Sequence, residues 1–263
     1  MHRKREILAG LAVLAVGTAA WSQSAVIGGK VYDNWWKTAG VATPAADQPL
    51  WATQSTNTRS GSTTWRCKEC HGWDYKGAEG AYGSGSHFTG FAGVLKAGSS
   101  LSAPELLARL DGTAQSDHDF SAMGPAHLSH LVEFLSTALI DVGPYIDART
   151  KAAVGGDRDH GQSLYSSTCA GCHGADGRTI NFQDPAEPEF VGTIAAGNPW
   201  EFIHKVRFGQ PAAAMPAGVD MGWRLEDVID VLDYAQTLPT GPAGTTAVAV
   251  SGWGAAKKAA RSE

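Results

Sequence analysis

The chain has 263 residues, which is the length of one or two domains, and 43% of them are hydrophobic, enough to form a buried core. Charged residues make up only 18%, and 21 Lys and Arg against 26 Asp and Glu leave a formal net charge of −5. This composition excludes a disordered chain and gives no broad basic surface for nucleic acid. Glycine is frequent, with 32 residues, and proline adds 12, so we expect much loop and few long elements.

The first residues have the two-part pattern of a secretory signal. Positions 2–5 are mostly basic, and residues 7–20 are apolar or small and carry no charge. This apolar run is shorter than the roughly 20 residues that a membrane-spanning helix needs. We therefore expect a signal peptide over residues 1–25 and a protein exported to the periplasm, with an uncleaved N-terminal anchor as the alternative.

All four cysteines lie in two C-x-x-C-H motifs. Two thiols at this spacing can form thioethers to the two vinyl groups of one haem, and the adjacent histidine then binds the iron. The motifs therefore predict two covalently attached haem c groups. The thioether residues are Cys67 and Cys70 for the first haem and Cys169 and Cys172 for the second, and the proximal iron ligands are His71 and His173.

A C-x-x-C pair alone also occurs in redox dithiols and as half of a zinc site. A zinc site would need the two pairs to meet, yet about 100 residues separate them, and it would not explain a histidine after each pair. A thioredoxin-like motif would need a βαβ setting, which the sequence does not suggest. The haem interpretation also leaves no cysteine for a disulfide.

The residues around the second motif carry a family resemblance. The segment 161–165 reads Gly-Gln-Ser-Leu-Tyr, and Ala-Asp-Gly follows Gly174. This stretch resembles the class I cytochrome c module, and the chain over about 29–239 resembles two-haem c-type cytochromes built from two fused modules. The resemblance implies an all-α fold with two tandem cytochrome c-like domains and glycine-rich haem loops.

The resemblance also implies the domain organisation. After the signal peptide we expect a first domain over 26–142, a linker over 143–156, a second domain over 157–239 and a flexible tail over 240–263. The first copy opens around Gly29-Lys30-Val31-Tyr32 and carries an insertion at about 38–64, which we interpret as a partner-specific surface.

Each copy has two further predicted helices. The middle helices, over 103–110 and 199–206, both begin near proline and end near glycine. The closing helices place apolar residues on one face over 128–139 and 225–232. In the family, the closing helix packs against the opening helix beside the haem.

A haem that only carries electrons needs a sixth iron ligand, commonly methionine or histidine. In the second copy Met215 precedes Pro216, a pairing typical of the family, and Met221 is the alternative. In the first copy the repeat favours His118, because Met215 stands six residues after Gly209 and His118 stands six after Gly112.

Met123 is the alternative sixth ligand of the first haem. It directly precedes the closing helix, where an apolar residue often packs against the helix. Three other histidines are weaker candidates, and two of them are expected on the surface of the closing helix. They are His87, His127 and His130.

These assignments favour a periplasmic electron-transfer protein that passes single electrons between a redox-protein donor and an acceptor. A membrane-bound oxidoreductase complex is one expected partner, and neither nucleic acid nor a small-molecule substrate is expected. A His/His first haem should have a lower potential than a His/Met second haem. The alternative is a dihaem enzyme of peroxidase-like or thiosulfate-oxidising type, in which one haem is open to substrate.

Overall fold

The computed structural model describes residues 10–242, with side chains from residue 25 onward. The basic start of the expected signal peptide and most of the expected tail lie outside these residues. Helices dominate, and the only β pairing among the described residues consists of isolated bridges. The prediction of an all-α fold is confirmed.

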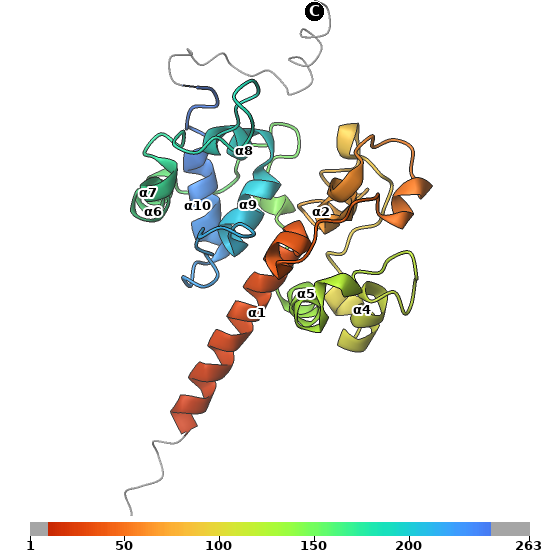
Figure 1. Ribbon diagram of the computed structural model, residues 1–263. Coiled ribbons are helices and arrows are strands. Elements are labelled where there is room, and N and C mark those ends of the chain that lie inside the picture. The colour runs from red at the N-terminus through yellow and green to blue at the C-terminus, as the bar shows by residue number, and fades with distance from the viewer. Residues whose placement is uncertain (1–9, 243–263) are drawn as a thin grey trace, which may run out of the picture. The chain divides into compact units, whose positions relative to one another are not determined.

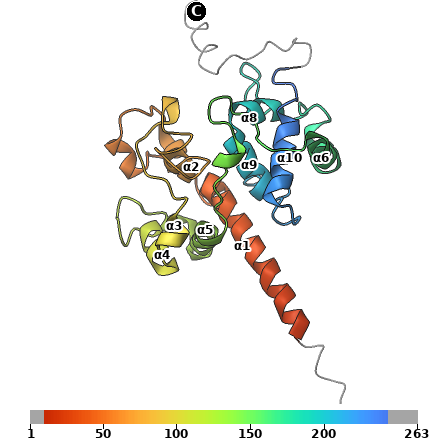
Figure 2. The same cartoon turned by 180° about the vertical axis from the view of Figure 1, so that it is seen from behind.

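The chain divides into two compact units (Figures 1 and 2). The first comprises the described residues up to Val142 together with His204–Arg224, and the second comprises Gly143–Ile203 and the described residues from Leu225 onward. The division falls within helix α9, Pro199–Phe208, so the segment after it groups with the first unit. The expected domain ranges, 26–142 and 157–239, stay a prediction.

The first unit is built around the pair α1 and α5. Helix α1 spans Gly10–Ala39, with a break at Asn34, and α5 spans Pro125–Thr137. The two helices pack against each other, and Figures 1 and 2 show them side by side. The shorter helices of this unit are α2, Cys67–His71; α3, Ala97–Ser100; and α4, Ala103–Leu110.

The second unit repeats this arrangement with α6, Arg158–Leu164, and α10, Leu225–Ala235, as its main pair. Helix α7, Ala170–His173, follows α6 through a π-helical turn at Tyr165–Cys169. Helix α8, Val191–Gly197, precedes α9. The predicted middle and closing helices of both copies are thus present.

Local sequence explains where several helices begin. The carboxylate of Glu105 accepts hydrogen bonds from the backbone N and the Oγ of Ser102, at 2.8 and 2.6 Å, which caps the first turn of α4. The carboxylate of Asp157 accepts from the backbone N of Asp159 and His160, which caps α6. These caps satisfy amide groups that have no partner within their own helix.

A glycine permits the close helix crossing in each unit. A Cβ added to Gly28 would lie 2.2 Å from the carbonyl oxygen of His130 in α5, and one added to Gly161 would lie 1.9 Å from that of Asp230 in α10. Each glycine stands four residues before a buried tyrosine, Tyr32 or Tyr165. The opening of the first copy therefore aligns through Gly28, one residue earlier than the expected Gly29.

Replacing Gly161 with alanine is expected to lower the free energy of unfolding by about 1–3 kcal/mol, because α6 and α10 must move apart. Urea denaturation of the holoprotein measures the change. The exposed Gln162, on the same helix, provides the control, since alanine there should change stability by less than about 0.5 kcal/mol. Equal effects at the two positions would contradict the packing argument.

None of the helices in the described part of the chain combines the length and the apolar character needed to cross a membrane.

Candidate metal and cofactor sites

Each C-x-x-C-H motif lies at a short helix next to a main helix of its unit. All four cysteines are free thiols, so no disulfide competes with haem attachment. After each motif the chain turns at a glycine with positive φ, 76° at Gly72 and 81° at Gly174. The hydroxyl of Tyr32 donates to the carbonyl of Gly72 at 2.6 Å, and that of Tyr165 donates to Gly174 at 3.0 Å. The two motifs are therefore held by equivalent contacts.

An aromatic pair repeats the same relation. The ring of Tyr32 lies 5.6 Å from that of Phe134 in α5, and the ring of Tyr165 lies 5.4 Å from that of Tyr234 in α10. In each unit the tyrosine thus joins three parts: the opening helix, the closing helix and the turn after the histidine. This repetition is the structural counterpart of the sequence repeat.

The first unit brings the rings of His71 and His118 close together. Their ring centres are 6.3 Å apart, and the ring planes are inclined by 73°. The Nδ1–H of His71 donates to the carbonyl of Ala92 at 2.7 Å, and the Nδ1–H of His118 donates to the carbonyl of Arg109 at 2.6 Å. These bonds orient both rings and leave both Nε2 atoms available as metal ligands.

Burial lowers the pKa of His71 to about 4; the hydrogen bond to Ala92 opposes this change, and the nearby His118 adds to it. The imidazole is therefore neutral at pH 7, which is the form that binds a metal ion.

The separation of the two rings fits one iron between them. A metal–imidazole nitrogen bond is about 2 Å long, so two imidazoles on opposite sides of one metal ion place their ring centres roughly 6 Å apart. The thiols of Cys67 and Cys70 lie on the same short helix as His71. These residues fit a covalently attached haem with two histidine ligands.

Met123, the alternative ligand, lies in the hydrophobic core of the first unit. Its side chain is 2% exposed and belongs to the cluster that contains Trp35, Leu131 and Phe134. It lies at the end of a 3₁₀ turn, Ser121–Met123, just before α5. Its packing is explained without a bond to iron.

The insertion supports the loop that carries His118, a contact that the sequence analysis missed. Gln48 is buried, and its Nε2 donates to the carbonyl of Asp117 at 2.6 Å. Its Oε1 accepts from the backbone N of Leu50 at 2.7 Å, and its own backbone N donates to the Oγ1 of Thr64 at 2.9 Å. Glutamine in a polar loop carries no distinctive pattern, so only the fold reveals this contact.

Replacing Gln48 with alanine should loosen the His118 loop. Groups that orient metal ligands typically affect metal binding by about 10–100-fold, and we expect cyanide to bind the ferric first haem more tightly by a factor in that range. A spectrophotometric cyanide titration measures the affinity. Thr53→Ala, an exposed change in the same insertion, serves as the control. Unchanged cyanide affinity in Gln48→Ala would argue against the supporting role.

In the second motif, the side chain of Cys172 is exposed and that of His173 is half-buried. Burial lowers the pKa of His173, which again favours the neutral imidazole. Its Nδ1 is buried and has no hydrogen-bond partner among the described residues. The imidazole of His173 is thus held differently from that of His71.

The two candidate methionines lie in the segment after α9. Met215 is half-buried and Met221 is 40% exposed. This segment belongs to the first unit and His173 to the second. The backbone of Gly218 donates to Val206 at 2.8 Å, so the loop with Met215 returns to α9.

The weaker histidine candidates have other contacts. His87 stacks on Tyr82, with ring centres 4.3 Å apart, and its Nδ1 lies 3.4 Å from the buried carboxylate of Glu69. His127 and His130 lie on α5 and are half-buried, more enclosed than expected for surface residues.

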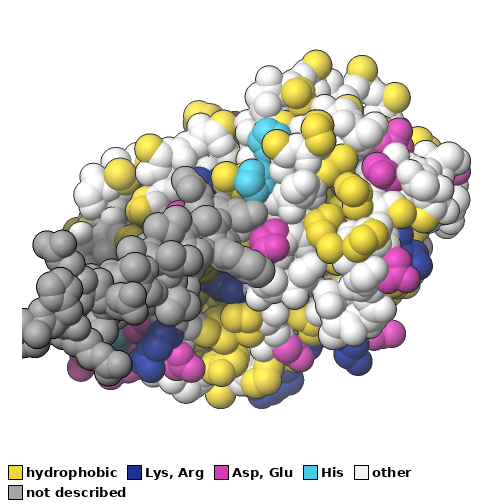
Figure 3. Space-filling view, turned by 90° about the horizontal axis from the view of Figure 1, so that it is seen from below, with side chains coloured by type: hydrophobic (Ala, Val, Ile, Leu, Met, Phe, Trp, Pro, Cys, Tyr) yellow, Lys and Arg dark blue, Asp and Glu magenta, His cyan; other side chains and the backbone are white. Residues whose placement is uncertain are grey.

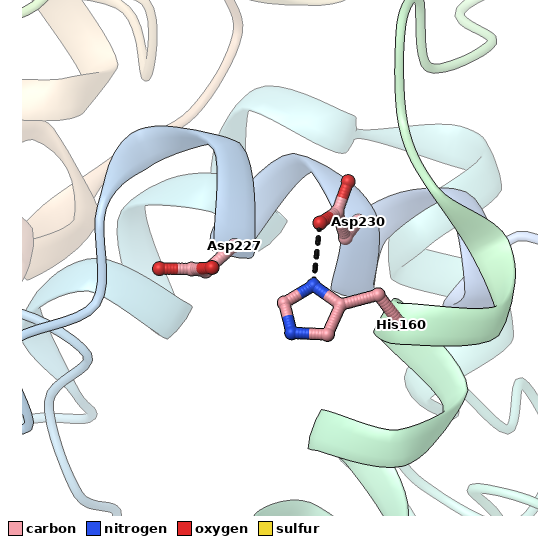
Figure 4. Close-up of side chains that lie close together, drawn as sticks. All are labelled: His160, Asp227 and Asp230. Carbon is pink, nitrogen blue, oxygen red and sulfur yellow. Dashed lines mark hydrogen bonds and ion pairs between the residues drawn. The ribbon is translucent and has the colours of Figure 1, made fainter.

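His160, Asp227 and Asp230 gather where α6 meets α10 (Figure 4). Each offers a potential ligand atom, and these atoms lie within 4.8 Å of one another. The Nδ1 of His160 lies 2.8 Å from one carboxylate oxygen of Asp230, and the other oxygen accepts from the backbone N of Asp157. These contacts join the two helices of the second unit.

Because of this ion pair, we expect the free energy of unfolding to depend on pH. The hydrogen bond to Asp230 raises the pKa of His160 above 6.5, so the pair stabilises the folded state below about pH 6.5 and loses this effect as pH rises through the folded-state pKa. His160→Gln should lack this component. Urea midpoints of both proteins between about pH 5.5 and 8 test it; parallel curves would refute the assignment.

The comparisons with known proteins concern the second copy. Residues 156–234 match the family described as cytochrome C oxidase, cbb3-type, subunit III. The matched segment includes Cys169, Cys172 and His173. No curated protein and no solved structure matches the chain significantly. The match and the helical fold support a c-type cytochrome with covalently bound haem and a role in electron transfer.

Proposed function

From the c-type cytochrome domain that residues 156–234 match, we propose that the protein is a periplasmic dihaem electron carrier. One haem is attached to Cys67 and Cys70, and the other to Cys169 and Cys172. The observation that carries this proposal is the opposed pair of His71 and His118, whose Nδ1 atoms are both engaged by carbonyl groups.

His71 and His118 would hold the first haem, and His173 and Met215 would hold the second. A covalently bound haem supplies an iron that accepts and releases one electron. With two protein side chains bound to it, such an iron would have no free position for an external ligand. The contacts of His71 and His118 with backbone carbonyls fix the ligands in place, so little rearrangement accompanies the change of charge.

The repetition of the glycine, the tyrosine and the turn after each histidine supports two haems. It suggests that both C-x-x-C-H motifs are held by the same kind of helix pair. A His/His haem has the lower potential and a His/Met haem the higher, because thioether ligation raises the potential. Electrons are therefore expected to pass from the first haem to the second.

The partners are a redox-protein donor and acceptor. The matched family is named for a subunit of a cytochrome c oxidase, which supports a membrane-bound redox complex as one partner. On the face shown in Figure 3, acidic and basic side chains are interspersed, and neither sign forms a continuous field. Contacts between electron-transfer proteins are small and transient.

Counting the haems tests the proposal. The pyridine haemochrome assay should give two haems per wild-type chain and one for Cys169→Ser/Cys172→Ser. In that variant, the spectrum of the first haem should stay low-spin and of His/His type. One haem per wild-type chain, or none, would refute the dihaem carrier.

A redox titration with spectral resolution then gives the order of the two potentials. The haem retained in Cys169→Ser/Cys172→Ser should account for the lower wave of the wild type. If it accounted for the higher wave, the proposed direction of electron flow would be wrong.

A further inference from the structure

Asp33 is a buried carboxylate on α1, directly after Tyr32. Its side chain is 1% exposed, and it forms ion pairs with Arg66 and Lys205. The Nε of Arg66 also donates to the backbone carbonyl of Asp33 at 2.8 Å. Burial favours the neutral acid, but Lys205 and Arg66 outweigh it and lower the pKa of Asp33 to about 2. Asp33 is therefore a permanent negative charge inside the first unit.

This charge lies close to the first haem-attachment motif. Arg66, which binds Asp33, directly precedes Cys67 in the chain. Burial raises the pKa of the Cys67 thiol to about 12, and the negative charge of Asp33 contributes to the rise. Through its ion pair with Arg66, the carboxylate of Asp33 is therefore held next to the residue that begins the motif.

Lys205, on helix α9, also contacts Asp33. Its ammonium group binds the carboxylate of Asp33 and the side-chain oxygen of Gln210, and it lies 5.3 Å from the ring centre of Trp73. The neighbouring His204 fixes this part of α9. It is fully buried, its Nδ1 accepts from the hydroxyl of Tyr75 at 2.8 Å, and its Nε2–H donates to the carbonyl of Gly29 at 2.9 Å.

We propose that Asp33 lowers the midpoint potential of the haem at Cys67 and Cys70, and that Lys205 partly cancels this effect. Oxidation of the iron adds one positive charge, which a nearby buried carboxylate stabilises and a nearby ammonium group destabilises. Such interactions are stronger in the protein interior than in water because the dielectric constant is lower. The inference rests on the proposed attachment of haem to the first motif.

Two variants that each remove one charge test the inference, because they should shift the midpoint potential in opposite directions. The measured quantity is the midpoint potential of the first haem in the holoprotein. Asp33→Asn should raise it, and Lys205→Met should lower it. The double variant should return toward the wild-type value. Loosened packing or added water would shift both single variants in the same direction, so opposite signs separate an electrostatic effect from a structural one.

The partly exposed pair Lys76 and Asp141 provides the control. Their charged groups are 2.6 Å apart, and the side chains are 27% and 49% exposed. Lys76→Met should shift the potential less than Lys205→Met, and high salt should remove that shift, because mobile ions screen exposed charges. The shifts at Asp33 and Lys205 should persist in high salt.

Shifts of the same sign at Asp33 and Lys205, or no shift, would overturn the inference while the haem count still supported the carrier. If Asp33→Asn fails to fold, Lys205→Met decides alone: a lowered potential supports the inference, and an unchanged or raised one overturns it. Failure of the proposed function looks different, since haem would then be missing from the first motif.

Discussion

Replacing His118 with alanine is expected to open the first haem to external ligands. The rings of His118 and His71 lie 6.3 Å apart, and the Nδ1 of His118 is engaged by the carbonyl of Arg109, so the proposed iron ligand is its Nε2. Without it, the iron should become high-spin in part and bind cyanide and carbon monoxide rapidly. Absorption spectra and ligand-binding kinetics of the holoprotein measure both changes.

Met123→Leu is the matched control, because Met123 is the other candidate ligand. Leucine retains most of the apolar volume in the core around Trp35 and Phe134, so we expect the low-spin spectrum to persist. The reverse outcome, an open iron in Met123→Leu and a closed one in His118→Ala, would assign the sixth position to methionine.

His118→Met gives a further expected result. Thioether ligation favours the ferrous state more than a second imidazole does, so a variant in which the new methionine binds should have a higher potential at the first haem. The difference between the midpoint potentials of the two haems would then become smaller. A redox titration of the variant measures the change, and a lowered potential would contradict the assigned ligand pair.

Replacing Met215 with alanine is expected to remove the proposed sixth ligand of the second haem. The thioether-to-iron absorption band of the oxidised protein should disappear, and the potential of the second haem should fall when water or another weak ligand replaces sulfur. The first haem should keep its spectrum, since His71 and His118 are unchanged. Optical spectra and potentiometry on the same samples report these effects.

Met221→Leu is the control for this experiment. Met221 is exposed in the same segment, six residues after Met215, and leucine there should leave the thioether band intact. Loss of the band in Met221→Leu, with retention in Met215→Ala, would transfer the ligand role to Met221. Retention of the band in both variants would exclude both methionines.

The helices follow from local sequence to a large extent. Prolines and capping residues mark the starts of α4, α5 and α9, and apolar periodicity marks α5 and α10. Which glycine of the opening helix lies at the helix crossing of the first copy is harder to predict from the sequence. Gly28 and Gly29 are adjacent, and only the crossing with α5 shows that Gly28 lies against the carbonyl of His130.

The network around Asp33 lies beyond what a sequence pattern can indicate. About 170 residues separate Asp33 from Lys205, and nothing in either local sequence predicts an ion pair. The same holds for Tyr75 and His204, whose hydrogen bond closes a fully buried site. Such pairs depend on chain segments that meet only after folding.

The sequence by itself determined the chemistry of attachment: four cysteines in two C-x-x-C-H motifs, with a histidine beside each pair, predict covalent haem because thioether bonding depends on local spacing. The tertiary structure decided how the surroundings of the first motif are arranged. It placed His118 opposite His71, Gln48 beneath the His118 loop, and Asp33 against Lys205. Orientation and electrostatic environment depend on contacts between distant segments, and those contacts exist only in the folded chain.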